Sequence, residues 1–121
     1  MSDNLGGRWV RFVSASVPQD KQQELKKTYG SIMRRIKMQK GLRRIYLLAE
    51  EGNPEKIISA TFWNTQRDAS AYVKSGAYNR NLATVRDLVT GKAAVTEYRV
   101  LMHDVGATVK PARKAKRGRK R

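Results

Sequence analysis

The residue types that support acid–base or metal chemistry are few in this chain. It has no cysteine and a single histidine, His103, which is followed by Asp104. A thiolate nucleophile, a disulfide and a multi-histidine metal site within one chain are therefore excluded. His103 beside Asp104 pairs a base with an orienting carboxylate, but neighbours on a strand point to opposite faces. We therefore expect His103 to be a surface residue, and the sequence identifies no catalytic residue, metal site or cofactor.

The net positive charge comes from two blocks, and the charges in the rest of the chain cancel. The formal net charge is +16, and residues 25–49 and 107–121 each contribute +8 because neither contains an acid. The first block falls on an expected helix, where a solvated face usually mixes charges of both signs. Its candidates for nucleic-acid contact are Lys26, Lys27, Arg34, Arg35 and Lys37. A solvated helix face is the alternative interpretation.

The second block is a run of Lys, Arg, Ala and Gly that has too few apolar residues to fold. We expect it to be a disordered basic tail that binds a polyanion, DNA or RNA, with strong salt dependence. Arg117-Gly118-Arg119 resembles the core of an AT-hook, whose arginines enter the minor groove of A·T-rich DNA. A solvated tail without function is the alternative. The candidate residues are Arg113, Lys114, Lys116, Arg117, Arg119, Lys120 and Arg121.

The elements that must position any site follow from the apolar pattern. Strands are expected at 9–17, 42–50, 56–64 and 93–102, and helical segments at 18–41, 65–76 and 77–89. Thr65 with Asp68 three residues later predicts a capped helix start, and the turn-forming run 51–55 predicts a hairpin. The order β-α-β-β-α-β predicts an α+β, ferredoxin-like fold with an antiparallel four-stranded sheet and helices on one face.

The strand at 56–64 also predicts an assembly. Neither of its alternating sets of residues is charged, whereas a sheet face open to water is usually polar. The helices can cover only one face. The economical cover for the other face is a second copy of the same sheet, so we expect a homodimer that forms a dimeric α+β barrel.

Length and composition set the remaining bounds. A chain of 121 residues accommodates one domain, expected over 1–106, followed by the tail at 107–121. Residues 1–9 lack the apolar run of a signal peptide, and no segment approaches the ~20 apolar residues of a membrane span. We expect a soluble, cytoplasmic protein.

The run ISATFWNTQRDASAYVKSGAY, which ends at Tyr78, resembles the antibiotic biosynthesis monooxygenase family of dimeric α+β barrels. In that family a strand ends in Trp, a capped helix follows, and a turn of small residues leads to an aromatic residue. The resemblance extends from Arg8 to Leu101. It implies an oxygenase whose pocket lies between the sheet and the helices.

The resemblance implies different chemistry in different subfamilies. Cofactor-free members oxidise anthrone-like phenols to quinones with molecular oxygen, and hold the substrate with the strand Trp and an Asn four residues earlier. Those positions are Trp63 and Ser59 here. Haem-degrading members carry a Trp in the second helix and a haem-ligating His ten residues later. Those positions are Tyr72 and Leu82, so haem ligation by that route is not expected.

Two functions follow as hypotheses. The first is a cofactor-independent monooxygenase acting on an aromatic or quinol-type substrate; its pocket candidates are Ser59, Trp63, Tyr72, Tyr78 and Arg86. For Trp63 and Tyr72 the alternative is a role in the core, and for Arg86 a surface ion pair with Asp87. The second is a nucleic-acid-binding dimer that uses the first helix and the Arg-Gly-Arg tail.

Overall fold

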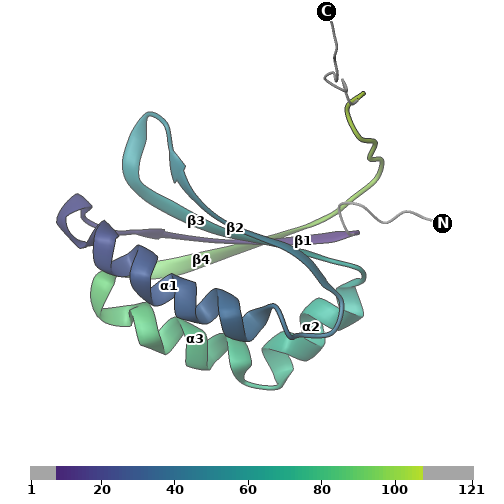
Figure 1. The fold of residues 1–121 in the computed structure, drawn as a ribbon, viewed down its shortest axis with the longest axis horizontal. Helices are drawn as coiled ribbons and strands as arrows, with labels where there is room; N and C mark the ends of the chain where they lie inside the picture. Colours follow the sequence, from purple (N-terminus) through teal and green to yellow (C-terminus); the bar gives the residue numbers. More distant parts are fainter. Residues whose placement is uncertain (1–7, 108–121) are drawn as a thin grey trace, which may run out of the picture.

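The computed structural model describes residues 8–107, which form a four-stranded antiparallel sheet with helices on one face (Figure 1). The strands are β1 (Trp9–Ser16), β2 (Leu42–Glu50), β3 (Asn53–Trp63) and β4 (Thr90–Arg99), in the sheet order β2-β3-β1-β4. The helices are α1 (Gln22–Ile36), α2 (Gln66–Lys74) and α3 (Ala77–Val85), with single 3-10 turns at Gln19–Lys21 and Arg86–Leu88. This confirms the ferredoxin-like α+β prediction.

Two strands, β3 and β4, have bounds that differ clearly from the sequence prediction. β3 begins at Asn53 because a register shift after Ala49 pairs Glu50 with Asn53, which extends the hairpin into the expected turn. β4 begins and ends earlier than expected, at Thr90 and Arg99. It stops where its partner β1 begins, since Arg99 pairs with Trp9, the first residue of that strand.

The helix ends follow their local sequence signals. The Thr65 hydroxyl accepts a hydrogen bond from the backbone N–H of Asp68 at 3.0 Å, which is the predicted N-cap of α2. Gly76 separates α2 from α3 with a φ of 88°. Gly41 precedes β2 with a φ of 85°, and a Cβ at this position would overlap the Asp68 carboxylate. The loop that follows α1 therefore packs at Gly41 directly against the first turn of α2.

The apolar stripe of α1 packs onto the covered face of the sheet. Its buried residues are Leu25, Tyr29, Ile32 and Ile36. The core has two clusters, one around Tyr29 and Ile57 and one around Trp63 and Tyr72. Trp63 is completely buried. Both clusters lie between the sheet and the helices, where the cavity described below also lies.

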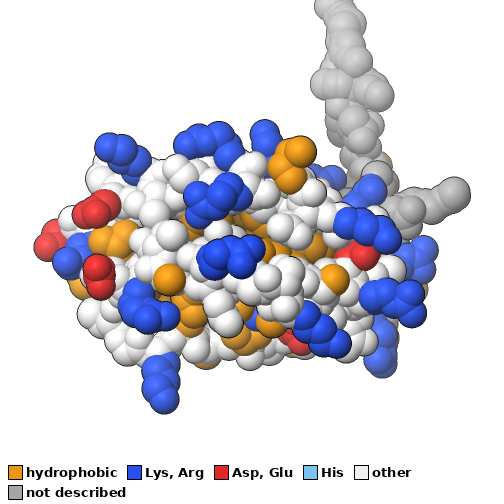
Figure 2. Space-filling view, turned by 90° about the horizontal axis from the view of Figure 1, so that it is seen from below, with side chains coloured by type: hydrophobic (Ala, Val, Ile, Leu, Met, Phe, Trp, Pro, Cys, Tyr) orange, Lys and Arg blue, Asp and Glu red, His pale blue; other side chains and the backbone are white. Residues whose placement is uncertain are grey.

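Of the two basic blocks, the structure describes the first, whereas nearly all of the second lies outside the described residues. The five candidates of the first block, Lys26, Lys27, Arg34 and Arg35 on α1 and Lys37 directly after it, are all exposed. Seen from below, from the side of the helices, the surface carries many Lys and Arg side chains and few Asp and Glu (Figure 2). The tail residues from 108 onward, with the Arg117-Gly118-Arg119 motif, lie outside the described residues. No helix in the range 8–107 is long and apolar enough to cross a membrane.

Replacement of Gly41 tests the link between α1 and α2. Gly41→Ala puts a side chain into the left-handed region, which costs about 1–2 kcal/mol, and adds the overlap with Asp68. We expect a lower midpoint in chemical denaturation. Gly30→Ala is the matched control, because Gly30 lies inside α1 with its nearest neighbouring atom 3.9 Å from the added Cβ. This control should raise stability by up to about 1 kcal/mol, and a loss of stability in both variants would contradict the interpretation.

Candidate functional site

A cavity of about 90 Å³ lies between the covered face of the sheet and the helices. Its walls are mainly aliphatic and come from all four strands and all three α-helices. The polar side chains in its lining are Arg11, Tyr29, Ser59, Thr61, Tyr72, Tyr78 and Asn81. A concave, mostly apolar space with a few convergent polar groups is typical of a small-molecule site.

Arg11 brings a charge into this apolar layer. It stands on β1, the residue is only 5% exposed, and its side chain lines the cavity. The guanidinium carbon lies 4.2 Å from the centroid of the Tyr78 ring, a cation–π geometry. Its Nε lies 3.7 Å from Oε2 of Glu97 on the neighbouring strand β4. Within the described residues, Nε and Nη1 of Arg11 are buried and have no hydrogen-bond partner.

Three side chains, one from each of the three α-helices, form a chain of hydrogen bonds that ends in the cavity. Arg35 Nη2 donates to Oδ1 of Asn81 at 3.1 Å, and Asn81 Nδ2 donates to the Tyr72 hydroxyl at 2.9 Å. Burial raises the pKa of Tyr72, although Asn81, Arg11 and Arg35 act in the opposite direction. Tyr72 therefore stays protonated at neutral pH, and the amide of Asn81 fixes the position of its hydroxyl.

The Tyr29 hydroxyl and the Ser59 hydroxyl are hydrogen-bonded to each other across the cavity wall. Burial raises the pKa of Tyr29 to about 12, because desolvation outweighs the hydrogen bond with Ser59. Tyr29 is therefore a neutral phenol and not a phenolate base at neutral pH. The pair offers hydroxyl groups, and no charge, to a bound molecule.

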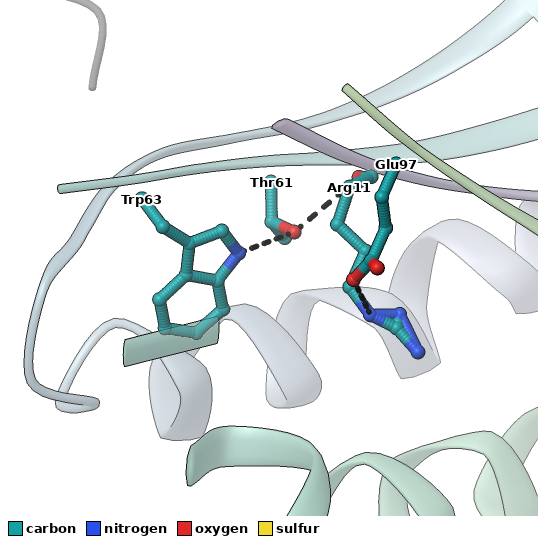
Figure 3. A network of polar contacts seen from close by, with 4 residues as sticks. All are labelled: Arg11, Thr61, Trp63 and Glu97. Atoms are coloured by element: carbon teal, nitrogen blue, oxygen red, sulfur yellow. Dashed lines mark hydrogen bonds and ion pairs between the residues drawn. The ribbon is translucent and has the colours of Figure 1, made fainter. Parts of the chain in front are cut away.

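Trp63 supports the cavity from behind and does not line it. Its indole Nε1 donates to the Thr61 hydroxyl at 2.9 Å, and that hydroxyl donates to the backbone carbonyl of Arg11 at 3.4 Å (Figure 3). The Trp63 ring lies 5.3 Å from the Tyr72 ring, centroid to centroid. Figure 3 shows the side chains of Arg11 and Glu97 extending from the sheet toward the helices. Trp63 thus orders β3 and Tyr72.

Arg86 lies at a separate, outer hollow. This hollow has a volume of about 420 Å³ and is lined by Arg86 and Lys92 together with Tyr78, Leu82, Val89 and Ala93. The last four also line the inner cavity, so the hollow adjoins it. Of the five sequence candidates, the structure brings Ser59, Tyr72 and Tyr78 together, puts Arg86 outside and buries Trp63.

Sequence reasoning missed four of the seven lining polar residues, Arg11, Tyr29, Thr61 and Asn81. Arg11 alternates with Val13 and Ala15 along β1, and a charge on the inward positions of a central strand was the signal that could have revealed it. Asn81 stands four residues before the buried Val85, on the apolar face of α3. Tyr29 was counted only as part of an apolar stripe. In each case the polar atom was concealed within a pattern typical of a core.

His103 and Asp104 are exposed beyond the end of β4, as expected. Within residues 8–107 no group of three or more His, Cys, Asp or Glu side chains could hold a metal ion. The donor set of the cavity does not suit a ligated haem iron either. Its lining has no histidine or cysteine, and Leu82 lines it where the haem-degrading pattern has a histidine.

Comparison with solved structures gives the same fold in several proteins. A Nitrosomonas europaea protein assigned to the antibiotic biosynthesis monooxygenases has a TM-score of 0.66 at 23% identity, covering 78% of this chain and 99% of that one. One from Bordetella bronchiseptica has a TM-score of 0.69 at 11% identity, covering 79% and 99%. The haem degrader MhuD of Mycobacterium tuberculosis, with two haems in its active site, has a TM-score of 0.67 at 22% identity, covering 81% and 99%.

Sequence comparison assigns the family. No curated protein matches the chain significantly. The sequence profile of the antibiotic biosynthesis monooxygenases matches residues 10–83, more than half of the chain, from β1 into α3. This range includes Arg11, Tyr29, Ser59, Tyr72, Tyr78 and Asn81. The chain therefore belongs to the antibiotic biosynthesis monooxygenase family.

Proposed function

We propose that this protein is a cofactor-independent monooxygenase that oxidises an aromatic or quinol-type substrate in the cavity between the sheet and the helices. The observation that carries the proposal is the Tyr72 hydroxyl, which Asn81 orients inside a cavity with mainly aliphatic walls. Family membership supports the reaction class. The solved relatives support the fold alone.

The reaction needs no metal when the substrate itself supplies the electrons. An anthrone-type substrate loses a proton from its acidic CH₂ group, and the carbanion transfers its electrons to dioxygen to form a C–O bond. Protonation gives a hydroperoxide, and loss of water leaves a ketone. The sum is CH₂ plus O₂ giving C=O plus H₂O.

In this scheme the protein's side chains bind the substrate and orient it. The protonated Tyr72 donates a hydrogen bond to the substrate carbonyl oxygen, where negative charge gathers when the carbanion forms. The aliphatic walls exclude water from the carbanion and the hydroperoxide. Tyr78 packs against the aromatic ring of the substrate. No residue is assigned as the base.

The sheet face opposite the helices supports the proposal of a homodimer. It carries two edge-to-face aromatic pairs, Phe12 with Tyr98 and Tyr46 with Phe62, and the exposed Leu48. Cross-strand pairing puts these residues on one face, and the helices cover the other (Figure 1). A contiguous apolar face of this kind is characteristic of an interface.

The nucleic-acid hypothesis stays a prediction. Its support within the described residues is the exposed basic side of α1, and of those side chains Arg35 is also bonded to Asn81. Family membership gives it no support. A solvated helix face explains the remaining residues equally well.

Oxygen uptake tests the monooxygenase proposal. Wild-type protein with an anthrone-type substrate should consume one O₂ for each quinone formed, measured with an oxygen electrode and by quinone absorbance. Tyr72→Phe should lower kcat/KM about tenfold, the value of one lost hydrogen bond of roughly 1.4 kcal/mol. Tyr98→Phe, the same change on the opposite sheet face, should leave kcat/KM unchanged. No uptake by the wild type across a panel of anthrones and quinols would overturn the proposal.

Light scattering during size-exclusion chromatography tests the homodimer. Wild type should elute with twice the mass of the chain, and Tyr46→Lys should yield monomer because it places a charge in the apolar interface. Met38→Lys changes an exposed apolar residue that lies outside the sheet and should leave the mass unchanged. A monomeric wild type at tens of micromolar would contradict the dimer.

A further inference from the structure

Arg11 has more hydrogen-bonding capacity than its surroundings satisfy. Its side chain is 6% exposed, and within the described part of the chain Nε and Nη1 are buried without a hydrogen-bond partner. An unsatisfied donor on a buried charged group costs several kcal/mol. Such an arrangement points to a ligand atom that completes the guanidinium when the site is occupied.

Glu97 compensates the charge of Arg11 only in part. The distance of 3.7 Å from its Oε2 to Nε exceeds that of a charge-assisted hydrogen bond, which is about 2.7–2.9 Å. The Glu97 side chain is 39% exposed on the edge strand β4, so water screens it. Arg11 therefore keeps an attraction for a second anion on the side that faces the cavity.

The fold itself does not require a charge at this position. Val13 and Ala15, the next inward residues of β1, are apolar and line the same cavity. Replacing a buried ion pair by apolar residues of similar size is often neutral or stabilising. A role in binding explains the presence of an arginine here better than a role in stability does.

The neighbours of the guanidinium define the ligand. One side of it is occupied by the Tyr78 ring, and the Tyr72 ring lies 6.3 Å from that of Tyr78, so aromatic surface adjoins the charge. The anion must exist at neutral pH, which a carboxylate does and an ordinary phenol, with a pKa near 10, does not. We propose that Arg11 binds the carboxylate of an aromatic acid whose ring lies against Tyr72 and Tyr78. That this acid is the substrate rests on the proposed function.

Calorimetry with a matched pair of probes tests the proposal on the full chain. The probes are 2-naphthoate and 2-naphthamide, which have nearly the same shape and differ in charge. Wild type should bind the carboxylate at least about tenfold more tightly than the amide, as one charge-assisted hydrogen bond predicts. Arg11→Met should bring the carboxylate down to the affinity of the amide and leave the amide unchanged.

Two further variants separate the cavity from the basic surface. Arg34→Met makes the same substitution at an exposed arginine of α1 and should preserve the tenfold preference. Glu97→Gln removes the competing carboxylate and should strengthen binding of 2-naphthoate. This second variant keeps Arg11, so it tests the proposal even when Arg11→Met does not fold.

Equal affinity of wild type for the two probes overturns the inference, as does a loss of preference in Arg34→Met equal to that in Arg11→Met. These results are independent of the oxygenase assay. Uptake of oxygen with a neutral anthrone and no preference for the carboxylate leaves the proposed function standing and removes the inference. An Arg11-dependent preference without oxygen uptake on any substrate supports the inference and overturns the proposed function.

Discussion

The arrangement of the site depends on the buried guanidinium of Arg11, which lies on the helix-covered face of the sheet. Desolvation of a charge costs several kcal/mol, so the groups around Arg11 must offset it. The Tyr78 ring contributes a cation–π contact, and Glu97 on the paired strand contributes a long ion pair. Trp63 and Thr61 hold the backbone of β1 from the neighbouring strand. The result is a buried charged group beside an apolar space.

Burial between the sheet and the helices also determines the protonation states of Tyr29 and Tyr72. Burial raises the pKa values of Tyr29 and Tyr72, and both therefore stay neutral donors at physiological pH. The orientation of Tyr72 comes from Asn81, whose other amide atom is held by Arg35 at the outer surface. A change at the exposed Arg35 would thus reach the cavity through two hydrogen bonds. The basic side of α1 is connected to the site by this contact.

The fold could be predicted from the sequence because the local helix and turn signals agree with the apolar pattern. Thr65, Gly76 and the stripe of α1 all lie as expected. The site was harder to predict, because its polar atoms are set within core-like patterns. The resemblance identified Ser59, Tyr72 and Tyr78, but Arg11 and Asn81 acquire meaning only when β1 and α3 face the same space. Trp63 shows the converse: its position in the family pattern implied a pocket residue, and packing behind Thr61 makes it a support.

A crystal structure with 2-naphthoate bound tests the central claim most directly, which is that the layer between sheet and helices is the binding site. The account predicts the naphthalene ring between Tyr72 and Tyr78 and the carboxylate within hydrogen-bond distance of the Arg11 guanidinium. A ring bound on the open sheet face or on the basic side of α1, with the surroundings of Arg11 unchanged, would contradict it.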